Sequence, residues 1–194
     1  MGLVGLAAEV KELAELDPSL LSDTELSELM VELHRLRAAL DAQHARLGAA
    51  WNTRSVWAAD GARSGAAWMA THTRAPRADY ASLLWLGSRM RSMTHIAAAW
   101  EAGEITTAHV RRLARAWNPR VDTDFIRDEA LLVHHARTLT FTKFCQTLDY
   151  WSQHADPDGA ALDDEERRAQ RRASLDETIS GMWSGSMLLD PING

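Results

Sequence analysis

One long amphipathic stretch decides the fold of this chain: residues 22–51 read SDTELSELMVELHRLRAALDAQHARLGAAW. Its first four residues form a capping-box pattern, in which Ser22 accepts from the backbone N–H of Glu25 and Glu25 reaches back to Ser22. Apolar residues then recur at spacings of three, four and seven, at Leu26, Leu29, Met30, Leu33, Leu36, Leu40, Leu47 and Trp51. The pattern predicts a single helix of about 30 residues.

A helix of this length needs a surface that covers its apolar residues. Either a helical bundle of the same chain covers them, or helix 22–51 pairs with a second chain as a homo-oligomer. We favour the bundle, because the polar residues opposite lack the sustained charge complementarity of a heptad repeat. The expected fold class is therefore mainly α: a multi-helix bundle with one long N-terminal helix.

Shorter elements are expected on both sides of this stretch. A helix pair over residues 65–72 and 76–93, joined by a tight connection, matches a helix-turn-helix in outline. Residues 173–189 alternate in character, which predicts a short C-terminal β-hairpin. We therefore divide the chain into a helical domain, 1–172, and a strand-turn-strand segment, 173–194, that we expect to be truncated. Further helical patterns occur at residues 2–16, 95–102, 106–117, 123–138 and 141–154.

The net charge of −6 hides an uneven distribution. Residues 1–53 and 121–194 carry net charges of −5 and −7, whereas residues 54–120 carry +6 and all ten of their basic residues are arginines. The planar guanidinium group suits phosphate oxygens and guanine edges, so the middle third predicts a surface for double-stranded DNA. The alternative interpretation is a solvated arginine face on a helical hairpin. The candidate DNA contacts are Arg63, Arg74, Arg77, Arg89, Arg111, Arg112 and Arg115.

The sequence carries no motif for catalysis, a cofactor or a metal ion. Cys145, the only cysteine, excludes an internal disulfide and a multi-cysteine zinc site. His109 has no partner at metal-ligand spacing, so we interpret it as a histidine bonded to a loop carbonyl rather than as a proton donor or ligand. No stretch approaches the roughly 18 apolar residues of a membrane span, and the N-terminus lacks the basic start of a signal peptide. We expect a cytoplasmic protein that is not an enzyme.

Several strings in the chain resemble those of a protein family. They are WAADGARS at residues 57–64, AWMA at 67–70, AGEI at 102–105, DPDG at 156–159 and the stretch 181–191. In this order, and over nearly the whole chain, they are similar to the domain of unknown function 222, the N-terminal part of the 13E12-repeat proteins of actinobacteria. Those proteins commonly carry an HNH endonuclease module behind this domain. The resemblance implies an intracellular protein from a mobile-element or nuclease context, and no established activity for the domain itself.

The HNH chemistry itself is not expected in this chain. It needs a general-base His and a metal-ligand His on a ββα hairpin, with an Asn that fixes the base. Asn occurs only at positions 52, 118 and 193, and no ββα stretch holds such a set, so the chain is expected to stop before any HNH module. Two main hypotheses follow: a non-catalytic helical module that binds DNA for an HNH-type protein, or a protein–protein interaction or oligomerisation domain that uses helix 22–51. An enzyme whose site lies in a missing segment is the third.

Overall fold

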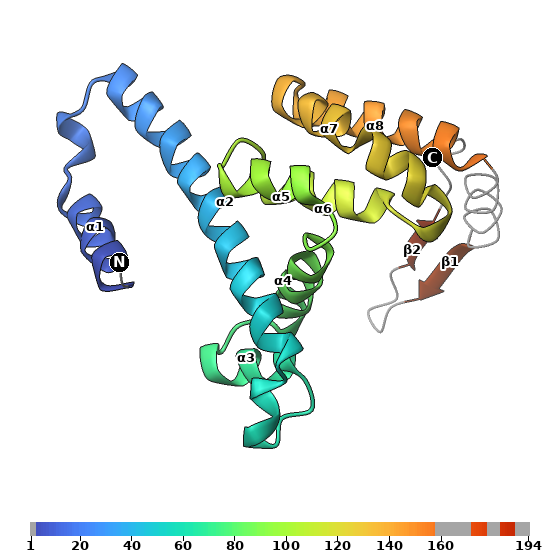
Figure 1. The fold of residues 1–194 in the computed structure, drawn as a ribbon, viewed down its shortest axis with the longest axis horizontal. Coiled ribbons are helices and arrows are strands. Elements are labelled where there is room, and N and C mark those ends of the chain that lie inside the picture. The colour runs from blue at the N-terminus through green and yellow to red at the C-terminus, as the bar shows by residue number, and fades with distance from the viewer. Residues whose placement is uncertain (1–2, 158–171, 178–182, 189–194) are drawn as a thin grey trace. The chain divides into compact units, whose positions relative to one another are not determined.

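The computed structural model describes residues 3–157, 172–177 and 183–188 (Figure 1). They contain eight α-helices and two short β-strands. The chain divides into two compact units, Met1–Thr107 and Ala108–Gly194. The predicted fold class therefore needs correction: the described chain is mainly helical, but it divides into two compact units where a single bundle was expected. The division falls inside the stretch 1–172 that the sequence predicts to be one domain.

The first unit is built on one long helix, α2 (Asp23–Thr53). Its start confirms the predicted capping box: Ser22 Oγ accepts from the Glu25 backbone N–H at 3.3 Å, and the Glu25 carboxylate accepts from the Ser22 backbone N–H at 2.9 Å. The Ser22 backbone N–H and hydroxyl hold the pKa of Glu25 below its usual value. The unit also contains α1 (Leu3–Glu15), α3 (Gly65–Thr73), α4 (Arg77–Arg89), α5 (Thr94–Glu101) and 3₁₀ turns at Pro18–Leu20 and Val56–Asp60.

The buried face of α2 is not the one that the sequence pattern predicts. Its buried residues are all alanines: Ala38, Ala42, Ala45 and Ala49. Most of its large apolar residues are exposed, among them Leu26, Met30, Leu36, Leu40 and Leu47. The prediction weighed side-chain size, whereas α4 and α5 pack so close to α2 that small side chains are the ones that fit between them. The expectation that a bundle covers these leucines is therefore wrong.

The close approach of α4 to α2 depends on Gly87. A Cβ atom at this position would lie 2.0 Å from the carbonyl oxygen of Ala45 and 3.0 Å from the Cβ atom of Ala49. Because no side chain separates the two backbones, α4 lies directly on the alanine face. The core around this contact is completed by Leu86, Met93, Ile96 and Trp100, each at most 2% exposed.

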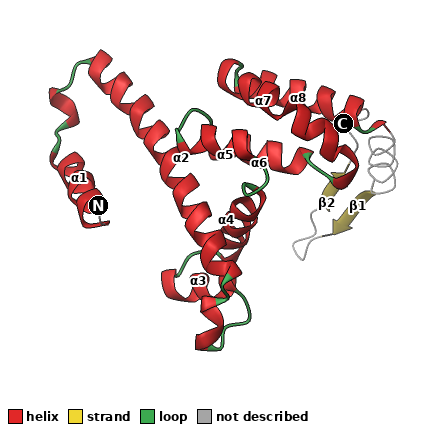
Figure 2. Ribbon diagram, in the orientation of Figure 1, coloured by secondary structure: helices red, strands yellow, loops and turns green. Residues whose placement is uncertain are grey.

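The second unit is described here by itself and is mainly a three-helix core. Its helices are α6 (Thr107–Ala116), which starts on the last residue of the first unit, α7 (Asp122–Thr138) and α8 (Phe141–Ala155), with a 3₁₀ turn at Pro119–Val121. Helices α7 and α8 lie against each other (Figure 2). The three helices bury Val110, Leu113, Phe125, Leu132, Phe144 and Leu148.

The chain's two described strands are β1 (Arg172–Glu177) and β2 (Trp183–Leu188). They pair antiparallel, with Arg172 opposite Leu188 and Glu177 opposite Trp183. The first paired residue of β1, Arg172, lies one position before the strand-turn-strand segment predicted over 173–194. The turn between the strands and residues 189–194 lie outside the described residues. The boundary near residue 172 stays a prediction.

Asp128 ties α7 to α8 through a charged contact. Its carboxylate accepts from Arg127 Nη2 at 2.7 Å and from the indole N–H of Trp151 on α8 at 2.9 Å. The hydrogen bond from Arg127, followed by the one from Trp151, lowers the pKa of Asp128 to about 2. The unfolded chain therefore holds this proton more tightly than the folded chain.

This difference predicts that the stability of the second unit depends on pH below neutrality. The stabilisation is complete above the unfolded pKa of 3.8 and is lost as the pH falls from there towards about 2. At neutral pH we expect Asp128→Asn to lower the free energy of unfolding by about 1–2 kcal/mol, after allowance for solvent screening. Urea denaturation at several pH values measures both effects. An unchanged acid profile in Asp128→Asn would contradict the assignment, and Trp151→Phe should remove only part of it.

Candidate nucleic-acid interface

The predicted helix pair is present as α3 and α4, joined by residues 74–76. Arg74 ends α3 with its backbone N–H donating to the carbonyl oxygen of Ala70 at 2.9 Å. The hydroxyl of Tyr80 on α4 donates to Thr73 Oγ1 at the end of α3. These bonds fix the backbone of the connection between α3 and α4.

Arg74 has φ 59°, in the left-handed region that favours glycine. A non-glycine residue there costs about 1 kcal/mol relative to glycine. A glycine would therefore end α3 at a lower conformational cost than the arginine that the chain carries.

Arg74 and Arg77 form an exposed basic pair at the start of α4. Among the described residues, no carboxylate forms an ion pair with either guanidinium group. Asp79, in the first turn of α4, is also exposed and is the one acidic residue of that helix. The entrance to α4 therefore presents two guanidinium groups and one carboxylate to solvent.

The exposed and the buried residues of α4 lie on different faces of the helix. Arg77, Ala78 and Ala81 are exposed, whereas Leu84, Leu86 and Gly87 are buried. At the far end, the Arg89 guanidinium lies 5.8 Å from the ring centroid of Trp85, at cation–π distance. Small residues between two basic ends allow a close approach of a partner to the helix. Arg77 and Arg89 are separated by about 18 Å along the axis.

The seven predicted arginines are not gathered in one unit. Arg63, Arg74, Arg77 and Arg89 belong to the first unit, and Arg111, Arg112 and Arg115 lie on α6. Arg63 precedes α3 and Arg74 follows it, so these two lie about 15 Å apart along the helix. Arg112 is neutralised by Asp149 on α8 at 2.5 Å. Within the first unit, Arg74 and Arg77 are the predicted arginines that flank the α3–α4 connection.

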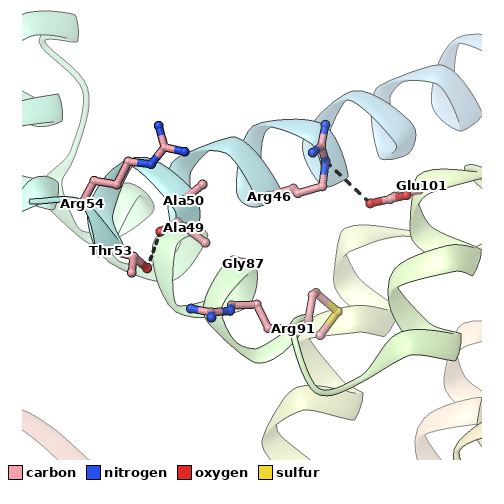
Figure 3. Close-up of a pocket in the computed structure, with 9 residues that line it drawn as sticks. Arg46, Ala49, Ala50, Thr53, Arg54, Gly87, Arg91 and Glu101 are labelled. Carbon is pink, nitrogen blue, oxygen red and sulfur yellow. Dashed lines mark hydrogen bonds and ion pairs between the residues drawn. The ribbon is translucent and has the colours of Figure 1, made fainter. Parts of the chain in front are cut away.

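A basic rim that the sequence interpretation did not include surrounds a pocket of about 490 Å³ in the first unit (Figure 3). Arg46 and Arg54 project from α2 and its end, and Arg91 comes from the turn after α4. Gly87, Ala49 and Ala50 also line the pocket, and Arg46 Nε lies 3.9 Å from the Glu101 carboxylate. This rim depends on the close contact of α2 and α4, which no local sequence pattern reveals.

His109 lies in the core of the second unit, 9% exposed. Its ring centroid is 5.0 Å from that of Phe141 and 4.9 Å from that of Phe144. Burial in these surroundings lowers the pKa of the imidazole, so the neutral ring is favoured. Residues 3–157, 172–177 and 183–188 hold no group of three or more His, Cys, Asp or Glu side chains that could bind a metal ion.

The family comparison covers most of the chain. Residues 24–194 match the model of a family described as a domain of unknown function, DUF222. No curated protein and no solved structure matches the chain. None of the described helices is long and apolar enough to cross a membrane. Because the match extends over far more than half of the sequence, the chain belongs to the DUF222 family.

Proposed function

We propose that this chain is a non-catalytic module that binds double-stranded DNA through α3 and α4. It would act in the cytoplasm as the targeting part of an HNH-endonuclease-type protein of mobile-element origin, in the context of the actinobacterial 13E12-repeat proteins. The observation that carries the proposal is the exposed pair Arg74 and Arg77 at a fixed helix connection. Residues 54–91 support it further, because they contain six arginines and two acidic residues.

The chemistry of the pair suits a phosphate backbone. Guanidinium groups donate two parallel hydrogen bonds to phosphate oxygens, and such charge-assisted bonds are stronger than neutral ones. In this arrangement Arg74 and Arg77 hold one strand, and the alanines of α4 face the duplex. Arg89, about 18 Å away along α4, would meet phosphates on the far side of a major groove about 12 Å wide. These contacts position the duplex, whereas base reading would come from the N-terminal end of α4.

The proposal predicts that DNA affinity depends steeply on salt. Each arginine–phosphate contact releases counterions, so the slope of log affinity against log salt is about −0.9 for each contact. Fluorescence anisotropy with a labelled duplex at increasing salt measures this slope. We expect Arg77→Gln to weaken binding and to reduce the slope by about one contact.

Lys143→Gln is the matched control, because it also removes one exposed positive charge but lies on α8 of the second unit. It should leave both affinity and slope unchanged. Absence of binding at low salt would refute the proposal. Equal losses in Arg77→Gln and Lys143→Gln would refute the placement at α4, since they would indicate attraction by overall charge alone.

A further inference from the structure

The long helix α2 has two apolar faces, and its own unit covers one of them. The alanine face, described above, lies against α4 and α5. The other face, which we call the leucine stripe, consists of Leu26, Leu29, Leu33, Leu36, Leu40 and Leu47. Four of these six leucines are between 38% and 59% exposed, namely Leu26, Leu36, Leu40 and Leu47. An apolar surface of this size and continuity marks an interaction site.

The leucine stripe and the alanine face lie on opposite sides of α2. Ala38 is two residues from both Leu36 and Leu40, which places it about 160–200° around the helix from each of them. The unit's own packing through α4 and α5 therefore does not compete with a partner on the leucine stripe. Figure 1 shows α4 and α5 together on one side of α2.

The spacing of the leucine stripe is that of a coiled coil. From Leu26 to Leu40 the leucines alternate at intervals of three and four, and Leu47 follows one heptad after Leu40. These are the a and d positions of three heptads, with Gln43 at the one d position that is not apolar. A single polar residue in such a seam specifies the register of the helices at a cost in stability.

The N-terminal helix α1 does not cover this surface. None of its described residues is buried. Its 13 residues extend over about 20 Å, whereas the leucine stripe extends over about 32 Å. Even folded back against α2, α1 would leave one end of the stripe exposed.

We propose that the leucine stripe pairs with the leucine stripe of a second copy of this chain, as a parallel two-stranded coiled coil. Gln43 Oε1 accepts from Arg46 Nε of its own helix at 2.9 Å. In the parallel register Gln43 meets its counterpart, so each amide N–H can donate to the second lone pair of the other Oε1. Glu32 lies at a g position and Arg37 at the following e position, so each Glu32 faces the Arg37 of the other copy. Glu32 also accepts from Arg35 of its own helix at both carboxylate oxygens, at 2.8 Å and 2.7 Å, and each oxygen has a further lone pair that can accept from Arg37 of the other copy.

The antiparallel arrangement is less favourable on the same residues. With the leucines fully overlapped, Gln43 faces Leu33 of the other copy, so its amide N–H groups have no acceptor across the seam and its Oε1 keeps only the bond from Arg46 of its own helix. The two Arg37 side chains then meet on the two-fold axis, where like charges repel. The parallel dimer has no like-charge pair at its e and g positions. It does not depend on DNA binding, but it would present two α3–α4 pairs to a duplex, as two-fold symmetric DNA-binding proteins do.

The mass of the whole chain in solution tests the dimer in the absence of DNA. Light scattering should give about twice 21.6 kDa over a wide range of protein concentration. Leu36→Glu/Leu40→Glu should give the monomer mass with unchanged helical circular dichroism, since both side chains are exposed within one chain. Val31→Glu is the matched control: Val31 is 72% exposed on the same helix but lies off the stripe, so this variant should stay dimeric.

Cross-linking tests the orientation. In a Cys145→Ser background, oxidised Gln43→Cys chains should form a disulfide-linked dimer, because the two positions face each other in the parallel register alone. A monomeric wild-type protein would overturn the proposal, as would a dimer that survives Leu36→Glu/Leu40→Glu. A dimer without the Gln43→Cys cross-link would overturn the parallel arrangement. DNA binding by a monomer would leave the proposed function intact while removing the dimer.

Discussion

Arg74→Gly/Arg77→Gln is expected to lose about a hundredfold in DNA affinity at low salt while the fold is kept. Each arginine supplies a charge-assisted bond to phosphate, and a tenfold loss for each corresponds to about 1.4 kcal/mol. The slope of log affinity against log salt should fall by about two contacts. Anisotropy with one duplex, measured for the wild type and the variant, gives both numbers.

The choice of glycine at position 74 separates binding from folding. The backbone there is left-handed, with φ 59°, so glycine relieves a conformational cost while it adds entropy to the unfolded chain. The two effects oppose each other, and we expect Arg74→Gly to change the free energy of unfolding by less than about 1 kcal/mol. A variant that binds DNA as tightly as the wild type would exclude the α3–α4 connection as the interface. A large loss of stability would instead show that Arg74 has a structural role.

Local sequence signals are sufficient to predict the helix ends, because a helix end depends on residues that are neighbours along the chain. The capping box of Ser22 and Glu25 starts α2 because both partners lie within one turn. The start of α4 at Arg77 follows from Pro76, because a proline suits the start of a helix. These features are determined by the backbone groups of adjacent residues, so a single sequence contains all of the information they need.

The burial of α2 could not be predicted in the same way, because it depends on a contact between distant segments. The large leucine side chains predicted that face of α2 as the buried one. In the structure, however, α4 brings Gly87 against Ala45 on the other face. Once two backbones approach this closely, only small side chains fit between them, and the leucines are left on the other side. The same contact creates the rim of Arg46, Arg54 and Arg91, so that basic surface was missed for the same reason.

The sequence indicates where part of the candidate site lies in the fold. Arg74 and Arg77 could be placed at a helix connection because turn chemistry is local. The grouping of all seven arginines assumed that a basic segment of sequence makes a basic surface. Arg112, however, reaches Asp149, 37 residues away, and is neutralised there. Charge pairing across a fold depends on tertiary contacts, and net charge by segment does not record them.

Gly87→Ala is expected to destabilise the first unit by roughly 2–3 kcal/mol, an effect as large as most core substitutions. The new methyl group would lie 2.0 Å from the Ala45 carbonyl oxygen, and because that atom belongs to the backbone of α2, the two helices must separate. Their separation also disturbs the pocket between Arg46 and Arg91.

Gly5→Ala is the control, since a Cβ at position 5 meets no atom within 4 Å, and it should be neutral or slightly stabilising, as alanine is the better helix former. Urea denaturation followed by circular dichroism compares the two variants. Equal stability of both would show that α4 does not rest on Ala45, and the close contact that leaves the leucine stripe exposed would then be excluded.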